Sequence, residues 1–284
     1  MTFAGRRWRR VNALVIAVHR FVLNRHALRG STRRHAALLA WLLCASTALS
    51  QPASLRVHTE SAHLDGWNVA IDVYEPSTLP AQGVAIIAHG FMRDRSRHRA
   101  LGEDLAAAGV IAVVPDLPHV MDHWGNGAAL AALANELEAG ALGLQPVARS
   151  DLVLIGTSAG GLASVVAASK LPGLAGWIGL DPVDRTGTGA SAAARLTSPA
   201  VVLLGGASQC NLLSSGRSFA RAVPRLIRST KFKDASHCDF EDPTNKFCEV
   251  MCGSASGEMQ ARIREDTVAA ALALLRDRDR DGAP

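Results

Sequence analysis

The residues best suited to chemistry in this 284-residue chain begin with a serine. Ser158 stands in the segment GTSAG at 156–160, which is a G-x-S-x-G pattern. An apolar run at 152–155 precedes the pattern and a helical pattern at 160–169 follows it. Small residues two positions on either side of the serine permit a tight strand-to-helix turn that exposes its hydroxyl. The context therefore predicts Ser158 as a nucleophile.

An aspartate and a histidine complete a catalytic set. Asp181 comes directly after the apolar run at 177–180, and His237 lies in the loop after residues 230–233. A histidine can take the proton of a serine hydroxyl, and a carboxylate can orient that histidine and stabilise its charged form. We predict His237 as the general base and Asp181 as the acid, with Asp184 as the alternative acid.

A third segment supplies candidate oxyanion donors. The sequence His89-Gly90-Phe91 follows the apolar run at 84–88. The backbone N–H groups of Phe91 and Ala159 are predicted to form a two-donor oxyanion hole. We expect His89 itself to be structural, hydrogen-bonded beneath the loop.

These residues need a scaffold that brings distant strand ends together. Several continuous apolar runs alternate with helical patterns, which indicates α/β structure with a mostly parallel sheet of about eight strands and helices on both faces. In such sheets the ligand site lies beyond the carboxyl ends of the strands. The expected strands are 55–59, 69–74, 84–88, 110–114, 152–155, 177–180, 201–204 and 230–233, and the expected helices are 95–108, 128–141, 160–169 and 259–276.

The motifs and their order resemble those of α/β-hydrolases over nearly all of residues 51–284. Gly179-Leu180-Asp181-Pro182 resembles the lipase motif that carries the triad acid, and 179–184 and 237–252 are similar to segments of chlorophyllases. Chlorophyllase-like and dienelactone-hydrolase-like esterases are the groups most similar in motif. This resemblance implies the α/β-hydrolase fold and hydrolysis of a small-molecule carboxylic ester through an acyl-enzyme, with no cofactor and no metal.

Other functions fit parts of the same pattern. A thioesterase, lactonase or peptidase would use the same three residues, and a non-catalytic binding protein could share the fold. A dinucleotide-binding protein would need G-x-G-x-x-G after the first parallel strand, where this chain has HGFMR at 89–93. Walls of the substrate cleft are expected from residues that follow strands, namely Phe91, Met92, His119, Val120, Met121, Trp124, Leu212 and Leu213.

The net charge of +5 is concentrated in the first 50 residues. These hold nine arginines and no acidic residue, whereas the remaining 21 basic and 25 acidic residues give the rest of the chain a formal charge of −4. We therefore expect no nucleic-acid partner. An uncharged run of 14 residues at 36–49, after Arg33-Arg34 and before Ser50, has the layout of a secretory signal and is short for a membrane span. The prediction is an exported domain at 51–284 behind a basic extension and signal peptide or anchor at 1–50.

Four cysteines remain after that leader, namely Cys210, Cys238, Cys248 and Cys252. An even number in an exported chain implies disulfides, and four cysteines allow three connectivities. A zinc site is the rival interpretation. Because three of the four cluster, the bonds are expected to tether the segment 238–252, with Cys210 as a candidate partner.

Overall fold

The computed structural model describes residues 55–281, with side chains up to residue 277. The predicted extension and signal peptide at 1–50 lies outside the described residues. The strands are β1 (Arg56–Leu64), β2 (Trp67–Glu75), β3 (Val84–Ala88), β4 (Ile111–Pro115), β5 (Leu152–Thr157), β6 (Gly176–Leu180), β7 (Ala200–Leu204) and β8 (Leu226–Lys231). The α-helices are α3 (Arg99–Ala107), α4 (His123–Ala139), α5 (Ala159–Ala168), α6 (Thr188–Ala193), α7 (Arg217–Ala222), α8 (Lys246–Cys252) and α9 (Gly257–Asp281). Short 3-10 helices are η1 (Arg95–His98), η2 (Arg149–Asp151) and η3 (His237–Phe240).

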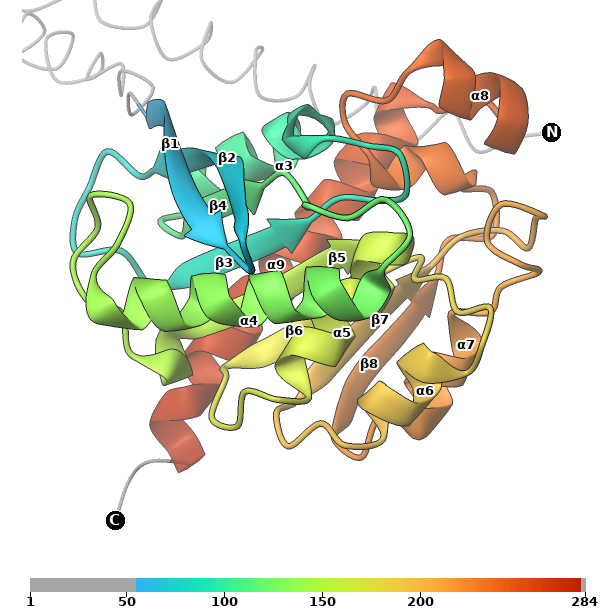
Figure 1. Cartoon of the computed structure of the whole chain (residues 1–284). Coiled ribbons are helices and arrows are strands. Elements are labelled where there is room, and N and C mark those ends of the chain that lie inside the picture. The colour runs from blue at the N-terminus through green and yellow to red at the C-terminus, as the bar shows by residue number, and fades with distance from the viewer. Residues whose placement is uncertain (1–54, 282–284) are drawn as a thin grey trace, which may run out of the picture. The chain divides into compact units, whose positions relative to one another are not determined.

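The eight strands form one sheet in the order β1-β2-β4-β3-β5-β6-β7-β8 (Figure 1). Strand β2 is antiparallel to both of its neighbours, and the strands from β4 to β8 run parallel to one another. The β1–β2 hairpin turns at Asp65-Gly66. This arrangement confirms the predicted mostly parallel sheet.

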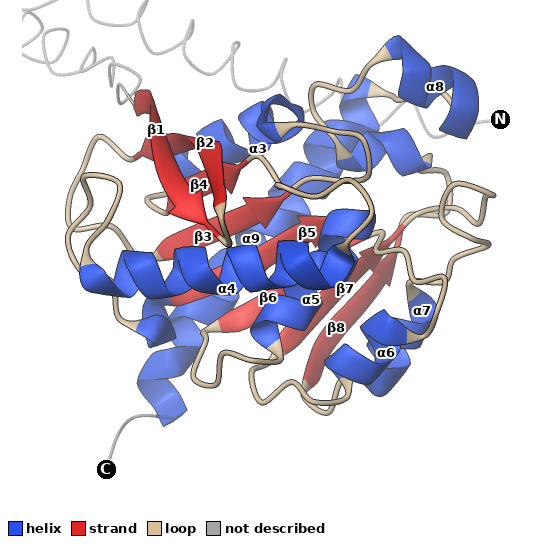
Figure 2. Cartoon of the chain, in the orientation of Figure 1, coloured by secondary structure: helices blue, strands red, loops and turns tan. Residues whose placement is uncertain are grey.

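Helices cover both faces of this sheet (Figure 2). Alternate residues of the buried strands point to opposite faces, so Ile86 packs in one core cluster and Ile87 in the other. Apolar residues of α4, α5, α6 and α7 lie in the first cluster, and those of α3 and α9 in the second. One apolar core thus lies on each face of the central strands, which explains why these strands are apolar throughout. The two cores together hold the strand ends in place.

Some element boundaries differ from the expected ones. Helix α4 begins at His123 rather than 128 because the Asp122 carboxylate accepts the N–H groups of Trp124 and Gly125. The last strand is 226–231 rather than 230–233, and it pairs with β7 as an exposed edge strand. The helices α6, α7 and α8 were not predicted. Within residues 55–281, no helix combines the length and the apolar character needed to cross a bilayer.

Candidate active site

Ser158 lies at a sharp turn between β5 and α5. Its backbone has φ 55° and ψ −121°, a strained conformation for a residue other than glycine. A side chain at Gly156 would collide with the carbonyl of Gly160, and one at Gly160 would collide with the carbonyl of Ala88. The two glycines of the pattern are therefore required by close backbone approach, and the turn lifts the Ser158 hydroxyl above the sheet.

The three residues singled out in the sequence form one chain of hydrogen bonds. The Nε2 atom of His237 lies 2.9 Å from Oγ of Ser158, and its Nδ1 atom lies 2.7 Å from Oδ2 of Asp181. Asp181 is fully buried, while the side chain of His237 is 11% exposed. The carboxylate thus faces the imidazole in a dry environment, and the imidazole faces the hydroxyl at the edge of the cleft.

The buried carboxylate of Asp181 is held by two further donors. The Gly205 N–H donates to its Oδ1 at 3.0 Å, and the amide of Asn211 donates to its Oδ2 at 3.0 Å. The same amide also donates to the carbonyl of Gly206 at 2.7 Å. Asn211 was missed in the sequence, because a single asparagine in a polar loop carries no pattern of its own.

The alternative acid, Asp184, is occupied elsewhere. Its carboxylate accepts the N–H groups of Thr186, Gly187 and Ala190, at the start of α6. The structure therefore brings Asp181 and not Asp184 to His237, and gives Asp184 a role in ordering the loop before α6.

The loop of His237 is fixed by its own short helix. Ser236 and Asp239 form a capping box around η3, and the carboxylate of Asp239 also accepts the N–H of Ser256 at 2.7 Å. His237 is the first residue of this helix. Local hydrogen bonds thus set where the imidazole enters the cleft.

Phe91 and Ala159, whose backbone N–H groups are the predicted oxyanion donors, lie in the same region as Ser158. Ala159 is the first residue of α5, and Phe91 follows β3; both line the same cleft as Ser158. The ring of His89 lies beneath this loop, where it bonds the Gly90 carbonyl through Nδ1 and accepts the Leu117 N–H through Nε2, each at 2.9 Å. Burial lowers the pKa of His89, which keeps the ring neutral and agrees with the structural role expected for it.

A buried ion pair links the oxyanion loop to the histidine loop. The Nε atom of Arg93 donates to both carboxylate oxygens of Glu241, at 3.1 and 2.9 Å. The two side chains are 10% and 6% exposed. Burial raises the pKa of Glu241, whereas the charges of Arg93 and His237 act in the opposite direction. This pair was not predicted, because its members are 148 residues apart in the sequence.

A cleft of about 740 Å³ opens over Ser158 and His237. This is within the volume range of small-molecule sites. Of the residues expected to form its walls, Phe91, Met92, Met121 and Leu212 do line it. His119 and Val120 border a smaller neighbouring cavity of about 50 Å³, and Trp124 and Leu213 border neither. The sequence missed the wall formed by α8, which contributes Phe247 and Met251.

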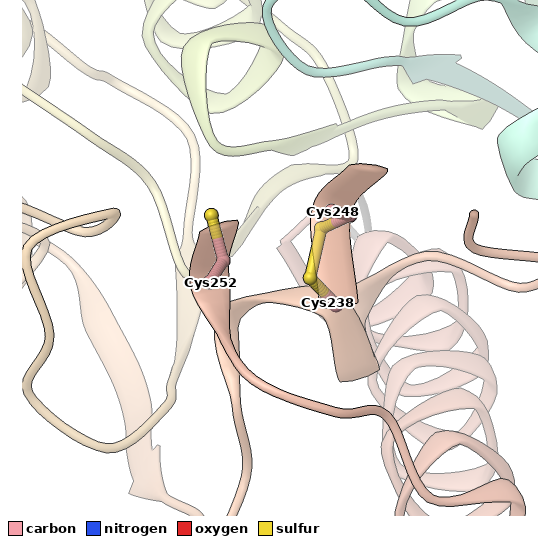
Figure 3. Close-up of side chains that lie close together, drawn as sticks. All are labelled: Cys238, Cys248 and Cys252. Atoms are coloured by element: carbon pink, nitrogen blue, oxygen red, sulfur yellow. A yellow bond between two sulfur atoms is a disulfide. The ribbon is translucent and has the colours of Figure 1, made fainter. Parts of the chain in front are cut away.

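The cysteines form two disulfides beside this cleft. Cys210 is bonded to Cys252, and Cys238 to Cys248. Figure 3 shows the second bond with Cys252 next to it, and the sulfur atoms of these three residues lie within 4.8 Å of one another. The tether of 238–252 and the partnership with Cys210 are confirmed. Because all four sulfurs are oxidised, they are not the thiolates that zinc binds.

The strand order, the turn at Ser158 and the positions of Asp181 and His237 at later strand ends define an α/β-hydrolase fold. Many solved structures share it, among them a dienelactone hydrolase and a putative dienelactone hydrolase. A dienelactone hydrolase from Anabaena variabilis ATCC 29413 superposes with a TM-score of 0.61 at 18% identity, covering 76% of this chain and 96% of that protein. A putative dienelactone hydrolase from Klebsiella pneumoniae subsp. pneumoniae MGH 78578 gives 0.57 at 15% identity, covering 78% and 99%.

Sequence comparison adds no relative. No protein-family model matches the chain, and no curated protein matches its sequence. At 15–18% identity the likeness to the two solved structures concerns the fold, and the function has to be argued from the site.

Proposed function

We propose that this chain is a serine hydrolase that cleaves a carboxylic ester through an acyl-enzyme. The observation that carries the proposal is the hydrogen-bonded sequence Ser158–His237–Asp181 at the floor of an open cleft. The α/β-hydrolase fold, shared with solved dienelactone hydrolases, agrees with it.

In the first half-reaction, Nε2 of His237 takes the proton from Ser158 as Oγ attacks the ester carbonyl. Asp181 accepts a hydrogen bond from Nδ1, holds the ring in the tautomer that leaves Nε2 free, and stabilises the imidazolium. The N–H groups of Phe91 and Ala159 bind the oxygen of the tetrahedral intermediate. His237 then returns the proton to the leaving alcohol, and the acyl group remains on Ser158.

The second half-reaction repeats the same steps with water. His237 deprotonates a water molecule that attacks the acyl-enzyme, and the proton then passes to Oγ of Ser158 as the carboxylic acid leaves. Each oxyanion donor contributes roughly 2.7–4 kcal/mol to such transition states. The scheme uses groups of this chain alone.

The deciding experiment uses protein without residues 1–50 and its Ser158→Ala variant. We expect hydrolysis of p-nitrophenyl esters by the wild type, loss of nearly all turnover in the variant, and reaction of a fluorophosphonate with the wild type only. A folded wild type that neither hydrolyses any ester nor reacts with the fluorophosphonate would leave a binding protein as the better interpretation.

We also propose that the protein is exported. The two disulfides indicate an oxidising compartment, where such bonds persist. The basic, then apolar, composition of residues 1–50 supports the same conclusion. Fractionation of cells that express the full chain, with disulfides assayed in the exported fraction, tests this directly.

A further inference from the structure

Helix α8 forms an apolar wall of the cleft that contains Ser158. Phe247 and Met251 stand one turn apart on the helix, and both line the cleft. They are nevertheless 60% and 63% exposed. Met92 and Met121 line the same cleft and are 65% and 71% exposed. Large apolar side chains gathered around an opening mark a surface that a ligand covers.

The charged residues near this wall include two ion pairs. On α8 itself, Lys246 bonds Glu249 at 2.7 Å. On the floor of the cleft, Arg93 and Glu241 neutralise each other. Arg185 is an exposed cation on the rim. The cleft surface near Ser158 is therefore largely apolar, and a neutral hydrocarbon group fits it better than an ionic one.

Two disulfides hold the wall in place. Cys248 is a buried residue of α8, and it is bonded to Cys238, the residue directly after His237. Cys252, the last residue of α8, is bonded to Cys210 on the loop after β7. A helix of seven residues is not stable in isolation, so these bonds fix the distance between the apolar wall and His237.

We propose that α8 is the specificity element of the site, and that the preferred substrate is a neutral ester with a long hydrocarbon group that lies against Phe247 and Met251. The inference rests on the proposed ester hydrolysis and names its substrate class. Each methylene buried against the wall strengthens binding by a factor of about four. A long-chain ester is therefore preferred over an acetate.

The test compares p-nitrophenyl acetate with p-nitrophenyl decanoate, and ethyl acetate with decyl acetate, so that the esters of each pair share one type of leaving group; each is used below its micelle concentration. We expect the wild type to show a kcat/KM at least about tenfold higher for the long ester than for the short ester in at least one pair. Replacing both side chains, Phe247→Ala with Met251→Ala, is expected to remove most of this preference, because KM rises much more for the long esters than for the short ones.

Val250→Ala is the matched control. Val250 lies on the same helix and is 82% exposed, but it does not line the cleft. We expect the long-chain preference to be unchanged in this variant. Equal labelling of Ser158 by a fluorophosphonate in all variants shows that the catalytic residues remain in place.

The outcomes separate this inference from the proposed function. Hydrolysis of the acetate without a long-chain preference overturns the role of α8 and leaves the serine hydrolase standing. An equal loss on short and long esters in the double variant also overturns it, and so does a preference for an anionic ester such as p-nitrophenyl hemisuccinate. Absence of both turnover and labelling in the wild type overturns the proposed function, and this inference with it.

Discussion

The two sides of the cleft are held by different forces. On the sheet side, Ser158 and Asp181 stand at strand ends between two apolar cores, and the side-chain oxygens of both have hydrogen-bond partners. On the α8 side, a seven-residue helix exposes large apolar side chains and is tied by two disulfides. Reactive groups need hydrogen-bond geometry, which a packed sheet supplies. A wall that contacts hydrocarbon needs a fixed position, which a covalent bond supplies.

The largest expected effect concerns the two carboxylates of the sheet side. Asp181→Asn is expected to lower kcat by about 10³- to 10⁴-fold, because an amide that has to bond both the Gly205 N–H and His237 favours the wrong histidine tautomer. Esterase kinetics with circular dichroism as a folding check measures this.

Asp184→Asn is the matched comparison. Its carboxylate bonds three N–H groups near α6 and does not contact His237, so we expect kcat to change little and the free energy of unfolding to fall by about 1 kcal/mol. The opposite ranking of the two variants would assign the acid to Asp184 and contradict the role proposed for Asp181.

The next effect concerns the buried ion pair between the two loops. Arg93→Met leaves Glu241 buried without its partner, which is expected to cost about 3–5 kcal/mol of stability at neutral pH. The double variant with Glu241→Leu is expected to recover most of that loss. Urea unfolding of the three proteins measures it.

The loss in Arg93→Met also depends on pH. Burial raises the pKa of Glu241 in the folded protein, so the folded state holds a proton that the unfolded state has released. Stability therefore falls as pH rises from the ordinary glutamate value of 4.5 through the raised one. Without Arg93 the pKa of Glu241 rises further. The difference in unfolding free energy between the wild type and Arg93→Met is therefore smallest near pH 4.5 and grows toward pH 7. A deficit independent of pH would show that Glu241 is not ionised beside Arg93.

On the α8 side, removing one disulfide is expected to cost less. The Cys210–Cys252 bond closes a segment of 42 residues, and the variant Cys210→Ser with Cys252→Ser is expected to lose about 2–4 kcal/mol of stability. Because Ser158, His237 and Asp181 are positioned by other contacts, labelling by a fluorophosphonate is expected to persist. Loss of labelling in this folded variant would show that the two sides are not independent.

The sequence predicted the residues that a local pattern marks and missed the contacts that join distant segments. Ser158 was found because its turn needs small residues at fixed offsets, and the glycines at 156 and 160 meet that requirement within the local chain. Asp181 was found because the apolar run before it marks the end of a strand, and His237 because it lies between the last expected strand and the closing helix. The Arg93–Glu241 pair and the bond from Asn211 to Asp181 join distant segments, and no local pattern signals such contacts.

Errors in the expected elements have the same origin. Strand β8 contains only a short apolar stretch and lies at the edge of the sheet, so its position is set by pairing with β7. The capping side chain of Asp122 sets the start of α4 at His123, five residues before the start expected from composition. Helix α8 is held by disulfides, whose pairing the cysteine spacing left open among three arrangements.

The last expected effect concerns a buried histidine of η1, on the sheet side. His98 is fully buried, and its Nε2 atom has no hydrogen-bond partner among the described residues. Burial lowers its pKa to about 3, and nearby His89 acts in the same direction. The folded protein therefore keeps this ring neutral at a pH where the unfolded chain binds a proton, and stability is lost as pH falls below 6.5.

From this histidine alone, the loss between pH 7 and pH 5 is about 2 kcal/mol. His98→Leu removes the titrating group from the same apolar site. The variant is therefore expected to lose about 2 kcal/mol less unfolding free energy than the wild type between pH 7 and pH 5. Urea unfolding at both pH values, with the disulfides intact, gives the two differences. An identical pH dependence in wild type and variant would mean that His98 binds its proton equally well in the folded and unfolded states, which contradicts a pKa lowered by burial.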